Sequence, residues 1–341
     1  MARSRRRSDF YNQPGLFDFQ SAPQQPCEGP WKPGDVVASG GVVEPQPEPT
    51  SLFDMEPTVV NDTNLRFMSF GSGSSGNCSY IGTDKFGILI DAGVDGATIE
   101  KALKRNGIDI YNVVAIIITH DHTDHIAHAY NLLKRHRHIS LYCTPKTLKG
   151  MLGRRGVASR IRDYHKAVYK EFQFYIKDFA ITPFEVSHDG ADNSGFCIEY
   201  NRHRFVVVTD TGFITERAEY YMRRATALMI ESDYDYDMLR TGHYPEHLKA
   251  RIMASKGHLD NRQVAEFLTT AWTPQLTNIF LCHLSKDNNT PELALQSARQ
   301  ALTQAGAASV GDASESIKAR RAPVQLYALP RFDPSPLFVI R

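Results

Sequence analysis

The 341-residue sequence lacks the features that mark membrane and secreted proteins. No apolar run approaches the ~20 residues that a membrane-spanning helix needs, and no apolar segment follows the Arg-rich start as in a signal peptide. The cysteines are few, odd in number and without a CxxC pair, which argues against a disulfide framework or a zinc knuckle. We therefore expect a cytoplasmic protein with no membrane contact. The cysteines are Cys27, Cys78, Cys143, Cys197 and Cys282.

The sequence also has little net charge, +1 from 39 basic and 38 acidic residues, but the charged residues are distributed unevenly along the chain. Nine of the 18 prolines precede residue 58, and residues 1–62 carry five basic and nine acidic side chains. Such a segment buries too little apolar surface to offset the entropy of ordering it. We predict a disordered Pro-rich tail at 1–62 and one domain at 63–341.

A strongly basic segment lies inside this domain, at 133–170. It holds eleven Lys and Arg against a single acid, Asp163, a net charge of +10, while the rest of the domain is −5. A basic run is usually a solvated face, but this concentration favours a polyanionic partner such as nucleic acid. The candidate contacts are Lys146, Lys149, Arg154, Arg155, Arg160 and Arg162.

The pattern of strands and helices predicts sheets covered by helices on their outer faces. Val113–Thr119, with the sequence VVAIIIT, is typical of a strand buried on both sides. Asp260 with Gln263, and Thr290 with Pro291, are typical helix starts. We predict helices at 97–106, 125–136, 145–152, 215–223, 245–255, 261–271 and 291–304. We predict strands at 65–70, 77–82, 86–91, 113–119, 139–143, 171–176, 179–187, 195–200, 203–209, 226–231, 277–281 and 324–328.

The strongest chemical signal is the HxHxDH motif that directly follows the buried strand at 113–119. In an extended loop, His120 and His122 project to one side, because residues i and i+2 share a face. Asp124 and His125 then open a helix and turn toward a second position. Imidazole and carboxylate ligands suit zinc, manganese or iron. The alternative is a surface histidine cluster, which a crevice at the end of a buried strand disfavours.

Three further ligand-type residues follow strands of their own. His188 ends an alternating strand, Asp210 follows FVVVT, and His283 follows IFLC. Taken singly, the first could be a structural histidine and the second a turn aspartate. Their shared placement at strand ends favours a common site.

In order along the chain, these motifs resemble those of the metallo-β-lactamase-fold hydrolases, and within them the YycJ/WalJ-type nuclease-like proteins. The resemblance covers about 65–305. It rests on FGSGSSGN at 70–77, LIDAG at 89–93, THDHTDH at 119–125, SHDG at 187–190, TDTG at 209–212, KGHLDN at 256–261 and CHLSKDNN at 282–289.

The resemblance implies an α+β four-layer αββα sandwich with a dinuclear metal site at one edge of its two central sheets. It assigns His120, His122 and His188 to one metal ion, and Asp124, His125 and His283 to the other, with Asp210 bridging the two. It places His258 beside the metals as a catalytic residue rather than a ligand. A surface turn histidine is the alternative. Asp91 is interpreted as support that orients a ligand histidine.

The function that the resemblance implies is metal-dependent phosphodiester hydrolysis of nucleic acid, as a DNA exonuclease, with DNA favoured over RNA. Two divalent ions, zinc or manganese with iron as the alternative, would serve the reaction. Asp124 would orient or deprotonate the attacking water, and His258 would protonate the leaving oxygen or steady a phosphoryl oxygen. A small-molecule hydrolase of the same fold, such as a thioesterase or lactamase, explains the ligands equally well but not the basic segment. A partner-binding protein with a vestigial site is the third hypothesis.

Two features of the sequence each allow two interpretations. The Gly/Ser loop at 71–76 is either an amide nest for a phosphate or a hairpin turn. In the tail, residues 13–19 and 51–55 share a Leu-Phe-Asp core, which is either a docking motif for a sliding clamp or a coincidental apolar patch.

Overall fold

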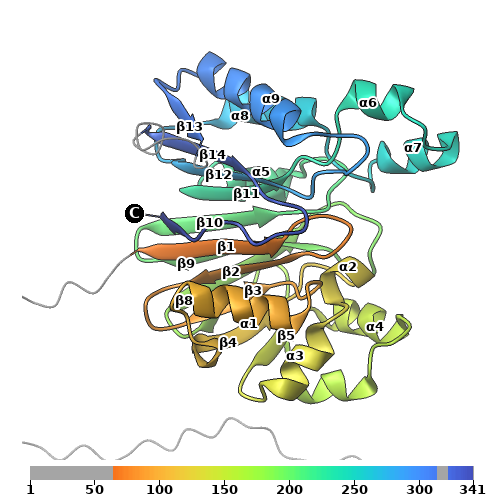
Figure 1. Cartoon of the computed structure of the whole chain (residues 1–341), viewed down its shortest axis with the longest axis vertical. Coiled ribbons are helices and arrows are strands. Elements are labelled where there is room, and N and C mark those ends of the chain that lie inside the picture. The colour runs from red at the N-terminus through yellow and green to blue at the C-terminus, as the bar shows by residue number, and fades with distance from the viewer. Residues whose placement is uncertain (1–63, 313–321, 341) are drawn as a thin grey trace, which may run out of the picture. The chain divides into compact units, whose positions relative to one another are not determined.

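Two β-sheets pack face to face between two groups of helices, so that the chain builds four layers (Figure 1). The computed structural model describes residues 64–312 and 322–340. The predicted tail at 1–62 and its Leu-Phe-Asp segments lie outside these residues. The predicted αββα class is confirmed.

The first sheet has seven strands in the order β15-β1-β2-β3-β4-β5-β6, and the second has eight in the order β13-β14-β12-β11-β10-β9-β8-β7. Strands of the first are β1 Leu65–Gly71, β2 Cys78–Gly82, β3 Gly87–Ile90, β4 Val113–Ile117, β5 Ser140–Cys143, β6 His165–Ala167 and β15 Phe338–Ile340. Strands of the second are β7 Phe174–Ile176, β8 Phe179–Glu185, β9 Ser194–Tyr200, β10 His203–Val208, β11 Ala227–Glu231, β12 Asn278–Cys282, β13 Val310–Asp312 and β14 Val324–Ala328. The runs β3-β4-β5-β6 and β10-β11-β12-β14-β13 are parallel.

Continuous apolar runs arise because each central strand is buried on both faces. In β4, Ile116 packs toward the outer helices while Ile117 packs between the sheets. Val206 and Val207 of β10 divide in the same way between the outer core and the inner one. Alternate side chains of a strand point to opposite faces, so both faces must be apolar here.

Helices cover the outer face of each sheet. Against the first sheet lie α1 Gly96–Arg105, α2 Thr123–Ile126, α3 Ala129–Arg135 and α4 Pro145–Gly153. Against the second lie α5 Glu216–Met222, α8 Asn261–Ala271 and α9 Pro291–Gln304. Two short helices, α6 Tyr236–Thr241 and α7 Glu246–Ile252, extend from the end of the second sheet (Figure 1).

The predicted single helix at 125–136 is wrong, because the chain forms α2 and α3 with a break between them. The carbonyls that would continue α2 are used elsewhere: Asp124 O accepts from Asn77 N at 2.8 Å, and His125 O accepts from Ala92 N at 2.7 Å. A side chain at Gly93 would meet Asp124 O at 1.6 Å, so only glycine permits this approach. The break ties the histidine motif to two preceding loops.

The other elements that the sequence did not predict are short and have no strong hydrophobic pattern. Strands β6, β13 and β15 have three residues each, and α6 has six. Edge position and tertiary contacts, rather than local periodicity, decide such segments.

Both predicted helix caps are present, and one offers a test of the fold. Thr290 Oγ1 accepts the Leu293 amide at 3.2 Å at the start of α9, and Pro291 occupies the first turn. We expect Thr290→Ala to lower the free energy of unfolding by about 1 kcal/mol. Denaturant unfolding measures this change. No change would show that the cap contributes nothing to stability.

Candidate metal centre

The histidine motif leaves β4 and turns at once into α2. His122 is the N-cap of that helix, and its ring centroid lies 4.6 Å from that of buried His120. His188, which follows β8, places its ring 5.0 Å from His120 and 4.8 Å from His122. One ligand-type atom from each of these histidines and from Asp210 lies within 4.8 Å of all the others. These residues form the first candidate metal group.

A second group adjoins the first. Asp124 Oδ2 lies 3.6 Å from His125 Nε2 and 3.7 Å from His283 Nε2. Asp124 is partly exposed, whereas both histidines are buried. Asp124 and His125 come from α2, which packs on the first sheet, whereas His283 follows β12 of the second sheet.

Asp210 lies between the two groups. Its Oδ2 is 3.8 Å from Nε2 of both His120 and His188, and 3.5 Å from His283 Nε2. Its Oδ1 is 3.4 Å from His125 Nε2. Burial raises the pKa of Asp210, but the charges of His283 and His125 outweigh it and hold that pKa well below its usual range. An ionised carboxylate therefore faces both groups, as a bridging ligand would.

The donor set fits metal ions. His120 Nε2 and His283 Nε2 are buried and have no hydrogen-bond partner among the described residues. Such orphaned nitrogens are costly unless something binds them. Burial holds the pKa of His120 well below its usual range, which keeps that ring neutral, as ligation requires. Burial acts in the same direction on His125 and His283, but the charge of Asp210 outweighs it and raises the pKa of both well above the usual range, so a metal ion would displace a proton from each of them. Imidazoles with carboxylates are ligands that zinc and manganese accept.

Asp91 lies behind the second group. Its Oδ2 is 2.7 Å from His125 Nδ1, and its two oxygens accept from the amide and the hydroxyl of Thr119, at 2.8 Å each. With Nδ1 held in this way, His125 Nε2 faces Asp210. This is the arrangement in which an outer carboxylate orients a ligand histidine.

Three residues at strand ends share an unusual backbone conformation. Asp91, Asp210 and His283 have φ of 60°, 49° and 55°, in the left-handed region that non-glycine residues rarely adopt. Each directly or almost directly follows a buried strand. Strain of this kind persists where the surroundings impose it, and it concentrates at functional sites.

His258 lies beside both groups and is held by Glu231. His258 Nδ1 is 2.6 Å from Glu231 Oε1, and Glu231 Oε2 accepts the Thr211 amide at 2.7 Å. The His258 ring stacks on His283 at 5.2 Å between centroids. Burial lowers the pKa of His258, but the charge and hydrogen bond of Glu231 outweigh it and raise that pKa to about 9.

The same region contains a third candidate group, Asp210 with Glu231, His258 and His283. This group would assign the ligands to the metal ions differently, with His258 as a ligand.

Sequence reasoning missed several residues of this centre, among them Asp189, whose Oδ1 lies 3.1 Å from His122 Nε2 and 3.4 Å from His188 Nε2. Glu231 is the last residue of the buried strand β11, the same kind of position that pointed to Asp210 and His283, so the signal was available. Asn77 closes the Gly/Ser loop, and its Nδ2 lies 2.9 Å from His125 Nε2 and 3.2 Å from Asp124 Oδ2. Nothing in its local pattern indicated this contact.

The loop at 71–76 forms the turn between β1 and β2, and three of its amides are engaged within the protein. The amide of Ser72 donates to Arg331 O, that of Gly73 to Asn77 Oδ1, and that of Gly76 to Gly73 O. Ser72 Oγ accepts the amide of His283 at 2.9 Å. The loop therefore contacts the backbone of the candidate ligand His283.

The basic segment at 133–170 runs from the end of α3 through β5, α4 and the 3-10 helix at Ser159–Tyr164 to β6, next to the histidine motif (Figure 1). Of the six predicted contacts, Arg154 differs from the rest because it is half-buried and paired with Asp121, Nη2 to Oδ2 at 2.8 Å. The other five are exposed and have no ion pair with a described residue: Lys146, Lys149, Arg155, Arg160 and Arg162.

A model of the β-lactamase superfamily domain matches residues 87–279. The exodeoxyribonuclease YycJ of Bacillus anthracis is 35% identical over 251 residues, 74% of this chain and 94% of that protein. The exodeoxyribonuclease WalJ of Streptococcus pneumoniae is 32% identical over 247 residues, 72% of this chain and 91% of that protein.

Solved structures share the fold. The metallo-β-lactamase fold protein YhfI from Bacillus subtilis aligns with a TM-score of 0.57 at 13% identity, over 81% of this chain and 99% of that one. Zinc-bound PqqB from Methylobacterium extorquens aligns with a TM-score of 0.54 at 16% identity, over 80% and 99%. Within the described residues, no helix combines the length and apolar character needed to cross a membrane.

Proposed function

This chain belongs to the β-lactamase superfamily, in the group of the exodeoxyribonucleases YycJ and WalJ, and from this we propose that it is a dinuclear metal-dependent nuclease that degrades DNA from an end. Membership makes it a metal-dependent hydrolase. The substrate, the residue roles and the partition of the metals are the proposal.

The observation that carries the proposal is the meeting of ligand-type side chains at the ends of parallel strands. Ligands after β4 come from the first sheet, while Asp210 and His283 follow β10 and β12 of the second sheet, which lie on either side of β11. Carboxyl ends of parallel strands lie at one edge of a sheet, where α/β proteins place their sites. The carboxyl ends of the parallel strands of both sheets therefore meet at the candidate metal centre.

The first ion would be held by His120, His122 and His188, and the second by Asp124, His125 and His283, with Asp210 shared. Divalent ions held in this way supply an activated water and neutralise the charge that develops on a phosphate. Asp91 and Glu231 keep the imidazoles oriented, since each holds a ring nitrogen that faces away from the centre.

Two side chains are placed for proton transfer. Asp124 is partly open to solvent, so its carboxylate can orient or accept a proton from the attacking water. His258 has one nitrogen on Glu231 and the other directed away from it, so its free Nε2 can donate to the leaving oxygen or to a phosphoryl oxygen.

The basic segment supports nucleic acid rather than a small molecule as substrate. If about five of its side chains meet phosphates of duplex DNA, the slope of log K against log salt should be roughly −5. Charge reversal of the exposed Arg155, Arg160 and Arg162 together should flatten this slope and leave the metal content unchanged. Fluorescence anisotropy with labelled duplex DNA measures the binding constants of the parent and the variant over a range of salt concentrations. A slope near zero in the parent would favour the small-molecule hydrolase.

The direct test is digestion of end-labelled DNA and RNA, single-stranded and duplex, by protein reconstituted with zinc or manganese. Stepwise release of nucleotides from DNA ends is expected. Circular DNA without ends serves as the matched control and should resist digestion. Hydrolysis of thioesters or lactams without any nucleic-acid cleavage would contradict the proposal.

A further inference from the structure

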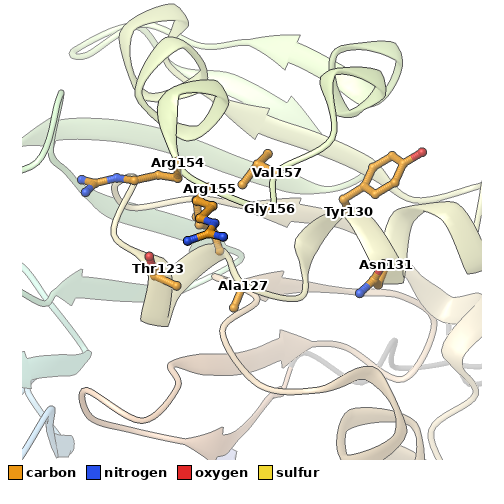
Figure 2. A pocket seen from close by; sticks show the side chains of 9 residues that line it. Thr123, Ala127, Tyr130, Asn131, Arg154, Arg155, Gly156 and Val157 are labelled. Atoms are coloured by element: carbon orange, nitrogen blue, oxygen red, sulfur yellow. The ribbon is translucent and has the colours of Figure 1, made fainter.

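A cavity of about 140 Å³ opens next to the histidine motif (Figure 2). It lies between α2, α3 and the turn at 154–157, and its polar lining residues are Thr123, Tyr130, Asn131, Arg154 and Arg155. Thr123 stands between His122 and Asp124 in the sequence, so the cavity adjoins the segment that carries two candidate metal ligands. Pockets for drug-sized molecules start at about 300 Å³, so this space suits a smaller group.

The two arginines at its rim are not equivalent. Arg154 donates to Asp121 Oδ2 from Nε at 2.9 Å and from Nη2 at 2.8 Å, and Figure 2 shows its side chain directed away from the cavity. Arg155 is directed into the cavity, toward Thr123 and Ala127 (Figure 2). It has no ion pair or hydrogen bond with any residue in 64–312 or 322–340.

The pairing of Arg154 fixes the turn that carries Arg155. Asp121 belongs to the histidine motif, is buried, and also accepts the Ala191 amide at 2.7 Å. A side chain on Gly150 of α4 would lie 2.7 Å from the Asp121 carboxylate, so α4 packs closely against it. The basic turn is therefore tied to the metal ligands, and Arg155 is the guanidinium left free to bind.

We propose that this cavity binds the phosphate of the linkage next to the one being cleaved, with Arg155 as its main contact. The inference rests on the proposed nuclease function. A guanidinium binds phosphate through two parallel hydrogen bonds, and the hydroxyl of Thr123 and the amide of Asn131 can add donors. Neither of those side chains bonds to another described residue, and no carboxylate lines the cavity. Ala127 and Val157 offer apolar contact to a sugar.

The test uses end-labelled DNA in which one linkage is an uncharged methylphosphonate, placed at successive positions from the end. In the parent, the methylphosphonate next to the cleaved linkage should raise KM by about tenfold or more, the usual worth of one charge-assisted contact. Arg155→Ala should raise KM by a similar factor on unmodified DNA and show no further loss at that position. Arg155→Lys should give an intermediate effect, because it keeps the charge without the fork.

Arg160→Ala is the matched control, since Arg160 is exposed and basic but does not line the cavity. It should weaken binding at all positions and retain the parent's position effect. If Arg155→Ala also retains that effect, or matches the parent's KM, the subsite is wrong while the nuclease proposal stands. A parent that cleaves no nucleic acid would overturn both.

Discussion

Asp210→Asn is expected to lose metal from both groups and to lower turnover by more than about 100-fold, because outer-sphere changes alone cost about 10–100-fold in metal affinity. Asp210 contacts ligand atoms of both groups, at 3.4–3.8 Å, so its charge serves two ions at once. Asparagine is preferred to alanine here because Asp210 has φ of 49°, a conformation that asparagine tolerates. Metal analysis by plasma mass spectrometry, together with DNA digestion, measures both losses.

Asp121→Asn is the matched control for this change. Asp121 lies in the same histidine motif and is buried, but its oxygens face Arg154 and Ala191 rather than the ligand atoms. It should keep both ions although it loses an ion pair. Full metal occupancy in Asp210→Asn, or equal losses in the two variants, would contradict the bridging role.

His258→Ala is expected to keep both metal ions and to bind DNA as the parent does, while turnover falls by about 10²–10⁴. The reason is geometric, since Glu231 holds one ring nitrogen and the other is free to donate. Glu231→Gln should also lower turnover, because it weakens the hydrogen bond that orients the His258 ring. Single-turnover digestion at saturating DNA separates this chemical loss from a loss of binding.

Two other outcomes would each reject the assignment. Loss of metal in His258→Ala would make His258 a ligand, in agreement with the third candidate group of Asp210, Glu231, His258 and His283. Unchanged turnover would leave it a turn histidine, with water as the proton donor. Added imidazole should partly restore turnover only if the side chain acts in proton transfer.

The site was predictable where local pattern and topology coincide. The motif at 119–125 follows a strand whose apolar run is explained by burial on both faces, and Asp210 and His283 follow buried parallel strands of the second sheet in the same way. Strand ends meet at one edge, so residues distant in sequence could be grouped before the structure was known.

The remainder depended on contacts between segments that local pattern does not encode. The break between α2 and α3 arises because Asn77 and Ala92 take the carbonyls of Asp124 and His125. The pairing of Arg154 with Asp121 spans 33 residues, so a count of charges could not separate Arg154 from Arg155.

Anomalous diffraction from crystals of the zinc- or manganese-loaded protein tests the central claim most directly. Two peaks are expected, one among His120, His122 and His188 and the other among Asp124, His125 and His283, with Asp210 between them. A single peak, or a second peak between Glu231 and His258, would contradict the proposed dinuclear centre.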